Sequence, residues 1–211
     1  RGGRIVGWLL FGAVLPVLLW VFLCAPARGR RRADPFRGTA FAHRGLHGPD
    51  CPENSRAAFA RACAAGYGIE LDVQMTRDGH LVVFHDDDAA RMTGRDGLIR
   101  DMTLSEVRAL NLAGGDAGIP TLDEVLETVY GRMPMLIEIK TTPGIGAVTE
   151  KAVERLKNYR GAYVMESFDP LCLYWLRKNA PKIIRGILVQ RYRDYRETQS
   201  PIVSFFASSL L

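Results

Sequence analysis

The stretch that decides the fold is GIELDVQMTRDGHLVVFHD, from Gly68 to Asp86. It contains two apolar runs, residues 69–73 and 81–84, separated by the turn-forming residues 76–79, and so predicts two strands joined by a short loop. Glu70 and Asp72 are two residues apart, so on a strand both carboxylates lie on one face and the apolar neighbours lie on the other. Inside a protein, two such carboxylates side by side are costly unless a cation lies between them.

This carboxylate pair has a second interpretation, a solvated face on an edge strand. What favours a functional cluster is the end of the second run, where His85 and Asp86 follow the strand directly. An imidazole beside paired carboxylates is the arrangement that metal-assisted acid/base chemistry requires.

The composition indicates one globular domain plus an extra apolar segment, since 47% of the 211 residues are hydrophobic and 24% are charged. The net charge of +5 comes from the N-terminal part. Of 28 Lys and Arg and 23 Asp and Glu, seven arginines and one acid precede His43, which leaves 21 basic and 22 acidic residues in the rest. The domain therefore shows no charge excess of the kind that binds nucleic acid. Four cysteines without a CxxC pair favour free thiols, with a Cys51–Cys63 disulfide as the alternative.

Residues 5–27 carry no charge. A membrane-spanning helix needs about 20 apolar residues, so residues 1–27 are predicted to form an N-terminal transmembrane anchor of a single-pass membrane protein. The alternative is a cleaved signal peptide, which Pro26 suits poorly. Residues 28–38 form a basic linker, and its four consecutive or near-consecutive arginines predict that the catalytic domain faces the cytoplasm.

Residues 39–211 alternate between strand and helix patterns, which predicts an α/β fold with parallel strands. The expected strands are 39–42, 69–73, 81–84, 135–140, 162–166 and 183–189, and the expected helices are 55–65, 121–130, 145–158 and 170–179, with a short one after residue 103. In barrels of this kind the chemistry lies at the carboxyl ends of the strands. The polar residues found in or just after the predicted strands are His43, Glu70, Asp72, His85, Glu138 and Lys140.

An ordered set of motifs resembles the glycerophosphodiester phosphodiesterases. They are AHRG (42–45), PENS (52–55), IELDV (69–73), VFHD (83–86), IPTLDEVL (119–126), IEIK (137–140) and ESFD (166–169). The resemblance implies a TIM (β/α)8-type barrel, one divalent cation, and hydrolysis of glycerophosphodiesters to glycerol 3-phosphate and an alcohol. In that family the barrel continues past residue 211, so we expect its last strands to be missing from this segment.

The resemblance also assigns roles to individual residues. It makes Glu70, Asp72 and Glu138 the metal ligands, and an all-oxygen set favours Mg²⁺ or Ca²⁺. The other assignments are His43 and His85 as the catalytic acid/base pair, Arg44 and Lys140 as the cations that bind the substrate phosphate, and Glu53 and Asn54 as supporting residues. Pairing with Glu138 alone is the other interpretation of Lys140.

Two other functions fit the same pattern. One is a phospholipase C- or D-like enzyme that cleaves lipid phosphodiesters on a related barrel. The other is a membrane-anchored binding module without turnover, which would be expected to lack one of the acids or histidines; none is missing. A small-molecule or lipid-derived glycerophosphodiester is the expected substrate, with the membrane contacted through the N-terminal helix.

Overall fold

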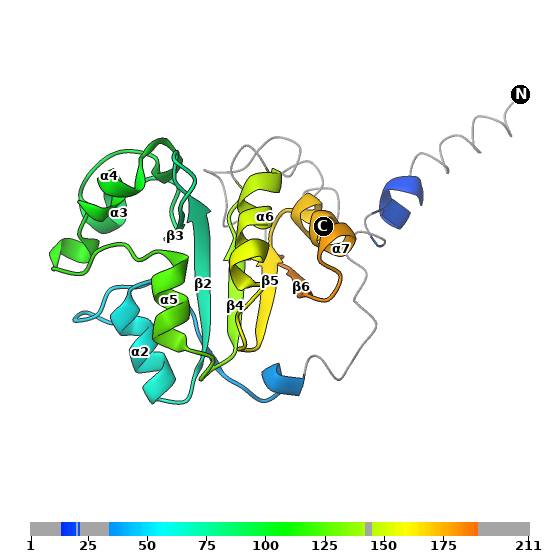
Figure 1. The fold of residues 1–211 in the computed structure, drawn as a ribbon, viewed down its shortest axis with the longest axis horizontal. Coiled ribbons are helices and arrows are strands. Elements are labelled where there is room, and N and C mark those ends of the chain that lie inside the picture. Colours follow the sequence, from blue (N-terminus) through cyan, green and yellow to red (C-terminus); the bar gives the residue numbers. More distant parts are fainter. Residues whose placement is uncertain (1–13, 20, 22–33, 142–144, 190–211) are drawn as a thin grey trace, which may run out of the picture.

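The structure is a computed structural model that describes residues 14–19, 21, 34–141 and 145–189 (Figure 1). Within these residues a six-stranded sheet has the order β1-β2-β4-β5-β6, with every neighbouring pair parallel, and β3 pairs antiparallel with β2. The strands are β1 (Phe41–Ala42), β2 (Gly68–Met75), β3 (Leu81–Val83), β4 (Met135–Ile139), β5 (Tyr163–Ser167) and β6 (Ile184–Ile187). The predicted parallel α/β architecture is confirmed.

Helices connect the parallel strands and cover the sheet (Figure 1). They are α2 (Arg56–Ala64), α3 (Ala90–Thr93), α4 (Leu104–Arg108), α5 (Leu122–Val129), α6 (Ile145–Leu156) and α7 (Pro170–Asn179), with 3₁₀ turns η2 (Ile99–Asp101) and η3 (Leu112–Gly114). Each of α4 and α5 begins with a complete capping box, in which Thr103 or Thr121 exchanges hydrogen bonds with the glutamate three residues on. The predicted helix starts are confirmed because local capping chemistry fixes them.

Strand β2 is buried on both faces, and this rules out the edge-strand interpretation. Its residues from Gly68 to Gln74 are all buried. On one face Ile69, Leu71 and Val73 are fully buried in the main core together with residues of α2, α5 and α6. Burying each such side chain stabilises the fold by about 1.5–3 kcal/mol, which offsets the cost of a polar opposite face.

The β2–β3 hairpin corrects one sequence-based expectation. His85 is predicted to lie beside the carboxylates at the end of a strand that points the same way as the other strands. Instead β3 runs back along β2, with Val83 opposite Val73, and the backbone N–H of Phe84 donates to the carbonyl of Asp72. The reversal of the chain therefore places His85 beside the middle of β2.

The predicted transmembrane segment, residues 5–27, lies outside the described residues except for 14–19 and 21. These are helical, and Val14, Leu15 and Leu18 are among their exposed apolar side chains. No helix within the described ranges combines the length and apolar character needed to cross a bilayer. The arginine cluster 28–32 is not described either. Cys51, Cys63 and Cys172 are free thiols, as predicted.

Gly45 offers a test of how tightly the loop after β1 packs on α2. Its φ is +82°, and a Cβ built there would lie 2.8 Å from Ala58 Cβ. Gly66, just after α2, has φ +76° but would meet nothing within 4 Å. Gly45→Ala should therefore lower the free energy of unfolding in two ways. Left-handed backbone strain should cost about 1–2 kcal/mol, and overpacking against α2 should cost about 1–3 kcal/mol more.

Gly66→Ala should lower the free energy of unfolding only through backbone strain, by about 1–2 kcal/mol. Urea unfolding of both variants measures the two free energies. Equal losses would show that the close approach of Gly45 to α2 does not constrain the loop.

Candidate active site

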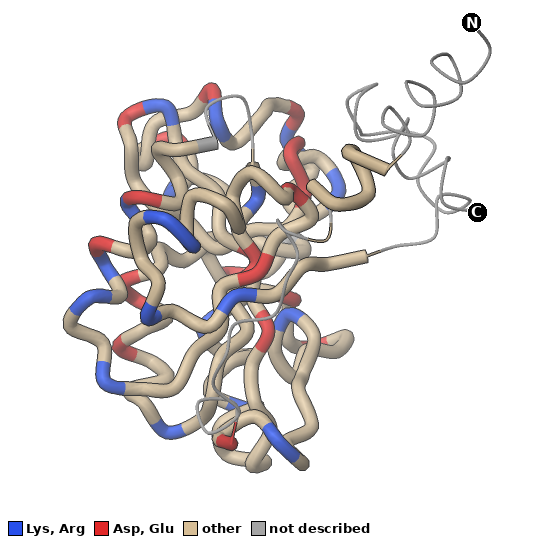
Figure 2. Tube along the Cα trace, turned by 90° about the vertical axis from the view of Figure 1, so that its right-hand side faces the viewer, with Lys and Arg blue, Asp and Glu red and all other residues tan. Residues whose placement is uncertain are grey.

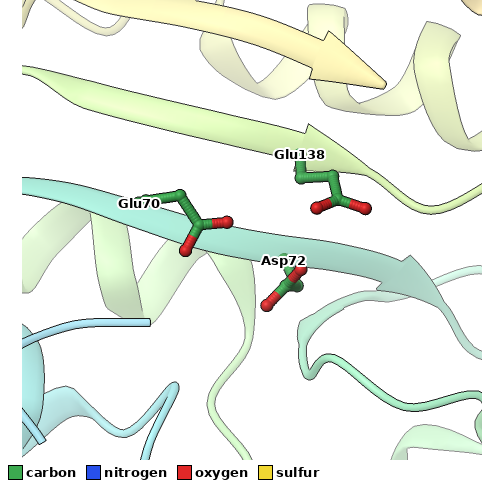
Figure 3. A group of neighbouring side chains, drawn as sticks. All are labelled: Glu70, Asp72 and Glu138. Carbon is green, nitrogen blue, oxygen red and sulfur yellow. The ribbon is translucent and has the colours of Figure 1, made fainter. Parts of the chain in front are cut away.

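Three carboxylates from neighbouring strands converge on the face of the sheet opposite to the one that carries Ile69, Leu71 and Val73 (Figure 3). Glu70 and Asp72 project from β2, and Glu138 projects from β4 directly opposite Asp72. One oxygen from each lies within 4.8 Å of the others, and all three residues are buried. The pleat repeat of β2 and the parallel register with β4 together create this cluster.

Lys140 lies across two of these carboxylates. Its Nζ is 2.6 Å from Glu138 Oε1 and 2.9 Å from Asp72 Oδ1. The alternative interpretation of Lys140, pairing with Glu138 alone, is therefore too narrow. The contact with Asp72 lacks hydrogen-bond geometry, so Asp72 Oδ1 is buried beside a charge but without a directed donor.

The loop between β1 and α2 brings one backbone N–H and two side chains to the cluster. Arg44 and Asn54 have positive φ, 56° and 54°, a conformation that costs energy for non-glycine residues and concentrates at functional sites. This lets the Arg44 N–H donate to Glu70 Oε2 at 2.8 Å. The Asn54 amide donates to Asp72 Oδ2 at 2.9 Å, and the Arg44 guanidinium donates to Glu53 Oε1 at 2.9 Å.

The carboxylates titrate unequally. Burial raises the pKa of Glu70 to about 8, and the charge of Asp72 adds to this shift. Burial also raises the pKa of Glu138, although Lys140 opposes the shift. For Asp72, burial is outweighed by Lys140 and by the Asn54 hydrogen bond, and the pKa is lowered. Lys140 and the Arg44 guanidinium, whose Nε lies 3.6 Å from Asp72 Oδ2, are the cations beside these three buried acids. The raised pKa values of Glu70 and Glu138 mean that a further cation would stabilise their ionised forms.

The donor set fits a hard divalent cation. Asn54 Oδ1 and Asp72 Oδ1 are buried and accept no hydrogen bond from the described residues, and Glu70, Asp72 and Glu138 each contribute one oxygen to the cluster. Oxygen ligands are what Mg²⁺ and Ca²⁺ prefer. The acidic triad could therefore hold a metal ion.

The two histidines flank the cluster in different settings. His43 has a side chain that is 69% exposed, and its Nε2 is 4.0 Å from Glu70 Oε2. His85 is 25% exposed and its Nδ1 is 2.6 Å from Asp86 Oδ1. Burial, together with Arg44 for His43 and Lys140 for His85, lowers both pKa values. Each imidazole is thus neutral near pH 7 and has one nitrogen free to accept a proton.

Three residues near the site escaped the sequence analysis as functional candidates. Gln74 donates to the carbonyls of Phe84 and Asp86 and so fixes the backbone that carries His85. It follows Glu70 and Asp72 at the same spacing of two, and this alternation was the available clue. Asp86 and Arg91 lie in a loop and a one-turn helix, where no periodicity indicates which side chains meet.

Acidic and basic residues are interspersed along the described Cα trace in the view of Figure 2. No extended face of Lys and Arg appears there among the described residues, in keeping with the even charge balance of the domain.

Comparison with known proteins gives a consistent result. Residues 43–211 match the model of the glycerophosphoryl diester phosphodiesterase family. A glycerophosphodiester phosphodiesterase of Caldanaerobacter subterraneus is 40% identical over 162 residues, which cover 71% of this chain and 65% of the relative. Glycerophosphodiester phosphodiesterase 1 of Mus musculus is 32% identical over 189 residues, 82% of this chain and 56% of the relative. The chain thus spans about two thirds or less of these relatives.

Solved structures agree. A phosphodiesterase of Oleispira antarctica, in complex with the product sn-glycerol-3-phosphate, superposes with a TM-score of 0.70 at 32% identity, covering 75% of this chain and 68% of that chain. A glycerophosphodiester phosphodiesterase of Thermotoga maritima superposes with a TM-score of 0.62 at 32% identity, covering 82% of this chain and 70% of that chain.

Proposed function

Because this chain belongs to the glycerophosphoryl diester phosphodiesterase family, we propose that it hydrolyses glycerophosphodiesters to glycerol 3-phosphate and an alcohol. The observation that carries the proposal is the buried triad Glu70, Asp72 and Glu138, with cationic side chains and two histidines beside it. We further propose that the sheet is part of a (β/α)8-type barrel, for which the parallel strand order is the support.

The triad is proposed to hold one divalent cation, Mg²⁺ or Ca²⁺. Support comes from the all-oxygen donor set and from the raised pKa values of Glu70 and Glu138, whose ionised forms a cation would stabilise. When bound, such an ion would stabilise the negative charge that grows on the phosphate oxygens.

Arg44 and Lys140 are proposed to bind the substrate phosphate. A phosphodiester is an anion, and it gains charge in the transition state, so fixed cations at its oxygens lower the barrier. Arg44 is held by Glu53, and Lys140 by Asp72 and Glu138, so both charges are positioned before substrate arrives. Glu53 and Asn54 are supporting residues in this scheme, because they hold Arg44 and Asp72 in place.

His43 and His85 are proposed as the acid/base pair. One imidazole, in its neutral form, accepts the proton of the glycerol hydroxyl next to the phosphate as its oxygen attacks phosphorus, and the other, in its protonated imidazolium form, donates a proton to the departing alcohol. The cyclic phosphate that results is opened by water, which returns the protons to their starting positions. The lowered pKa values support the accepting role, because a neutral imidazole is the form that acts as a base.

The reaction is tested by measuring glycerol 3-phosphate released from glycerophosphocholine and glycerophosphoglycerol by the full chain. We expect release with Mg²⁺ or Ca²⁺ and none with EDTA. Absence of release from folded protein that binds the metal would overturn the proposed substrate class. A lipid phosphodiester such as lysophosphatidylcholine, tested in parallel, distinguishes the phospholipase-like alternative.

The histidine roles are tested with His43→Ala and His85→Ala. Each should lower kcat by about a hundredfold or more, the contribution typical of a general acid or base. His80, which lies at the far end of the hairpin and half-exposed beside Asp78, is the matched control, and His80→Ala should retain activity.

Isothermal titration with Mg²⁺ and Ca²⁺ separates the two parts of the site. The histidine variants should bind metal like the parent, whereas Glu70→Gln and Asp72→Asn should bind it more weakly. Near-normal kcat in either histidine variant would remove that residue from the acid/base role, and unchanged titrations of the carboxylate variants would refute the ligand assignment.

The N-terminal segment is proposed to anchor the protein in a membrane, with the catalytic domain in the cytoplasm. The support is the uncharged run 5–27, the exposed apolar side chains at 14–19 and 21, and the arginines that follow. Expressed in cells, the full chain should sediment with membranes after a carbonate wash, and a chain lacking residues 1–38 should not. Recovery of the full chain in the wash supernatant would refute the anchor.

A further inference from the structure

A continuous chain of charged contacts links the two sides of the site. Arg44 donates to Glu53 Oε1 at 2.9 Å, and Arg91 Nη2 donates to the same oxygen at 2.6 Å. The guanidinium of Arg91 also meets both oxygens of Asp86, through Nε at 2.5 Å and Nη2 at 3.1 Å. Asp86 Oδ1 in turn lies 2.6 Å from His85 Nδ1.

Arg91 occupies the centre of this chain. It comes from α3, 38 residues after Glu53 and five after Asp86, so it joins the loop after β1 to the loop after β3. Its planar guanidinium can satisfy two carboxylates at once, which the single ammonium of lysine does less well. Without it, Glu53 and Asp86 would each keep one cationic or imidazole neighbour but would not be held to each other.

Asp86 determines which nitrogen of His85 is free. Burial opposes ionisation of Asp86, but the hydrogen bonds from Arg91 and His85 outweigh it and lower its pKa, so the group is a carboxylate that accepts. His85 therefore donates its Nδ1–H to Asp86 and presents Nε2 without a proton. If the Asp86 carboxylate turned away, the Nδ1–H tautomer of His85 would no longer be favoured and its imidazole ring could rotate.

We propose that Arg91 is a positioning residue that holds Asp86, and through it the His85 imidazole, in a fixed relation to Glu53 and Arg44. The histidine that exchanges protons and the arginine that binds the phosphate are then parts of one rigid unit. The kinetic consequences rest on the proposed function, whereas the orientation of His85 does not.

An ordinary surface ion pair is the competing explanation, and it predicts little effect. The Arg91 side chain is 49% exposed, as in such pairs. The side chains of its partners are less exposed than in such pairs, 15% for Glu53 and 22% for Asp86, and both contact residues of the site. This burial of the acceptors is what separates the two explanations.

The first measurement is ¹⁵N NMR of the histidine side chains in the full chain without substrate, with the His85 signals assigned from His85→Ala. The parent protein should show His85 with the proton on Nδ1. Arg91→Met should show a mixture of the two tautomers, while Arg95→Met, an exposed arginine four residues on, should match the parent. An unchanged His85 tautomer in Arg91→Met overturns the proposal.

The second measurement is steady-state kinetics of Arg91→Met, Asp86→Asn and the double variant. Each single variant should lower kcat about ten- to a hundredfold, since a small displacement of a reacting group can cost about a hundredfold. The double variant should stay within about threefold of the worse single variant, because both changes break one connection.

Losses that multiply in the double variant, or an Arg91→Met enzyme with the parent kcat, would overturn the inference. If the parent and Arg95→Met show no phosphodiester turnover, the proposed function fails, and the tautomer measurement still decides the role of Arg91.

Discussion

The compensation of buried negative charge on strand β2 is the constraint on which the rest of the site depends. Glu70 and Asp72 lie on a strand that is buried on both faces, with Glu138 opposite on β4. Such a cluster persists only if neighbouring groups stabilise it. Lys140, which follows β4, supplies part of that stabilisation, and the Arg44 backbone N–H and the Asn54 amide supply part of it from the loop between β1 and α2. The geometry of the surrounding loops follows from this requirement.

The two faces of β2 have different roles, one in stability and the other in the candidate site. The face with Ile69, Leu71 and Val73 is fully buried against helices and supplies the stability of the sheet. The other face carries Glu70, Asp72 and Gln74, which are polar and still buried. The left-handed backbone of Arg44 and Asn54 is a further cost that the apolar packing offsets, as is usual where a loop must present groups to a site.

The fold was predictable where local chemistry determines it. Alternation with a period of two placed Glu70 and Asp72 on one face, and capping boxes at Thr103 and Thr121 fixed two helix starts. The contact of Lys140 with Asp72 was missed because it depends on pairing between strands more than sixty residues apart. The Arg91 network was missed because its members lie in short irregular segments, where only the folded chain brings the side chains together. The roles of the predicted site residues stay predictions.

The parallel pairing of β2 with β4 has a consequence for the mechanics of the sheet. Glu70 and Asp72 belong to one strand and Glu138 to the next, while the segment between these strands includes the hairpin and three helices. An ion held by all three would act as a crosslink between adjacent strands, closing a long chain loop at its base much as a disulfide does. Because such an ion binds only the paired strands, its binding free energy would add to the stability of the domain itself. Chelation would then destabilise the centre of the sheet, because the ion used in catalysis would also hold β2 and β4 together.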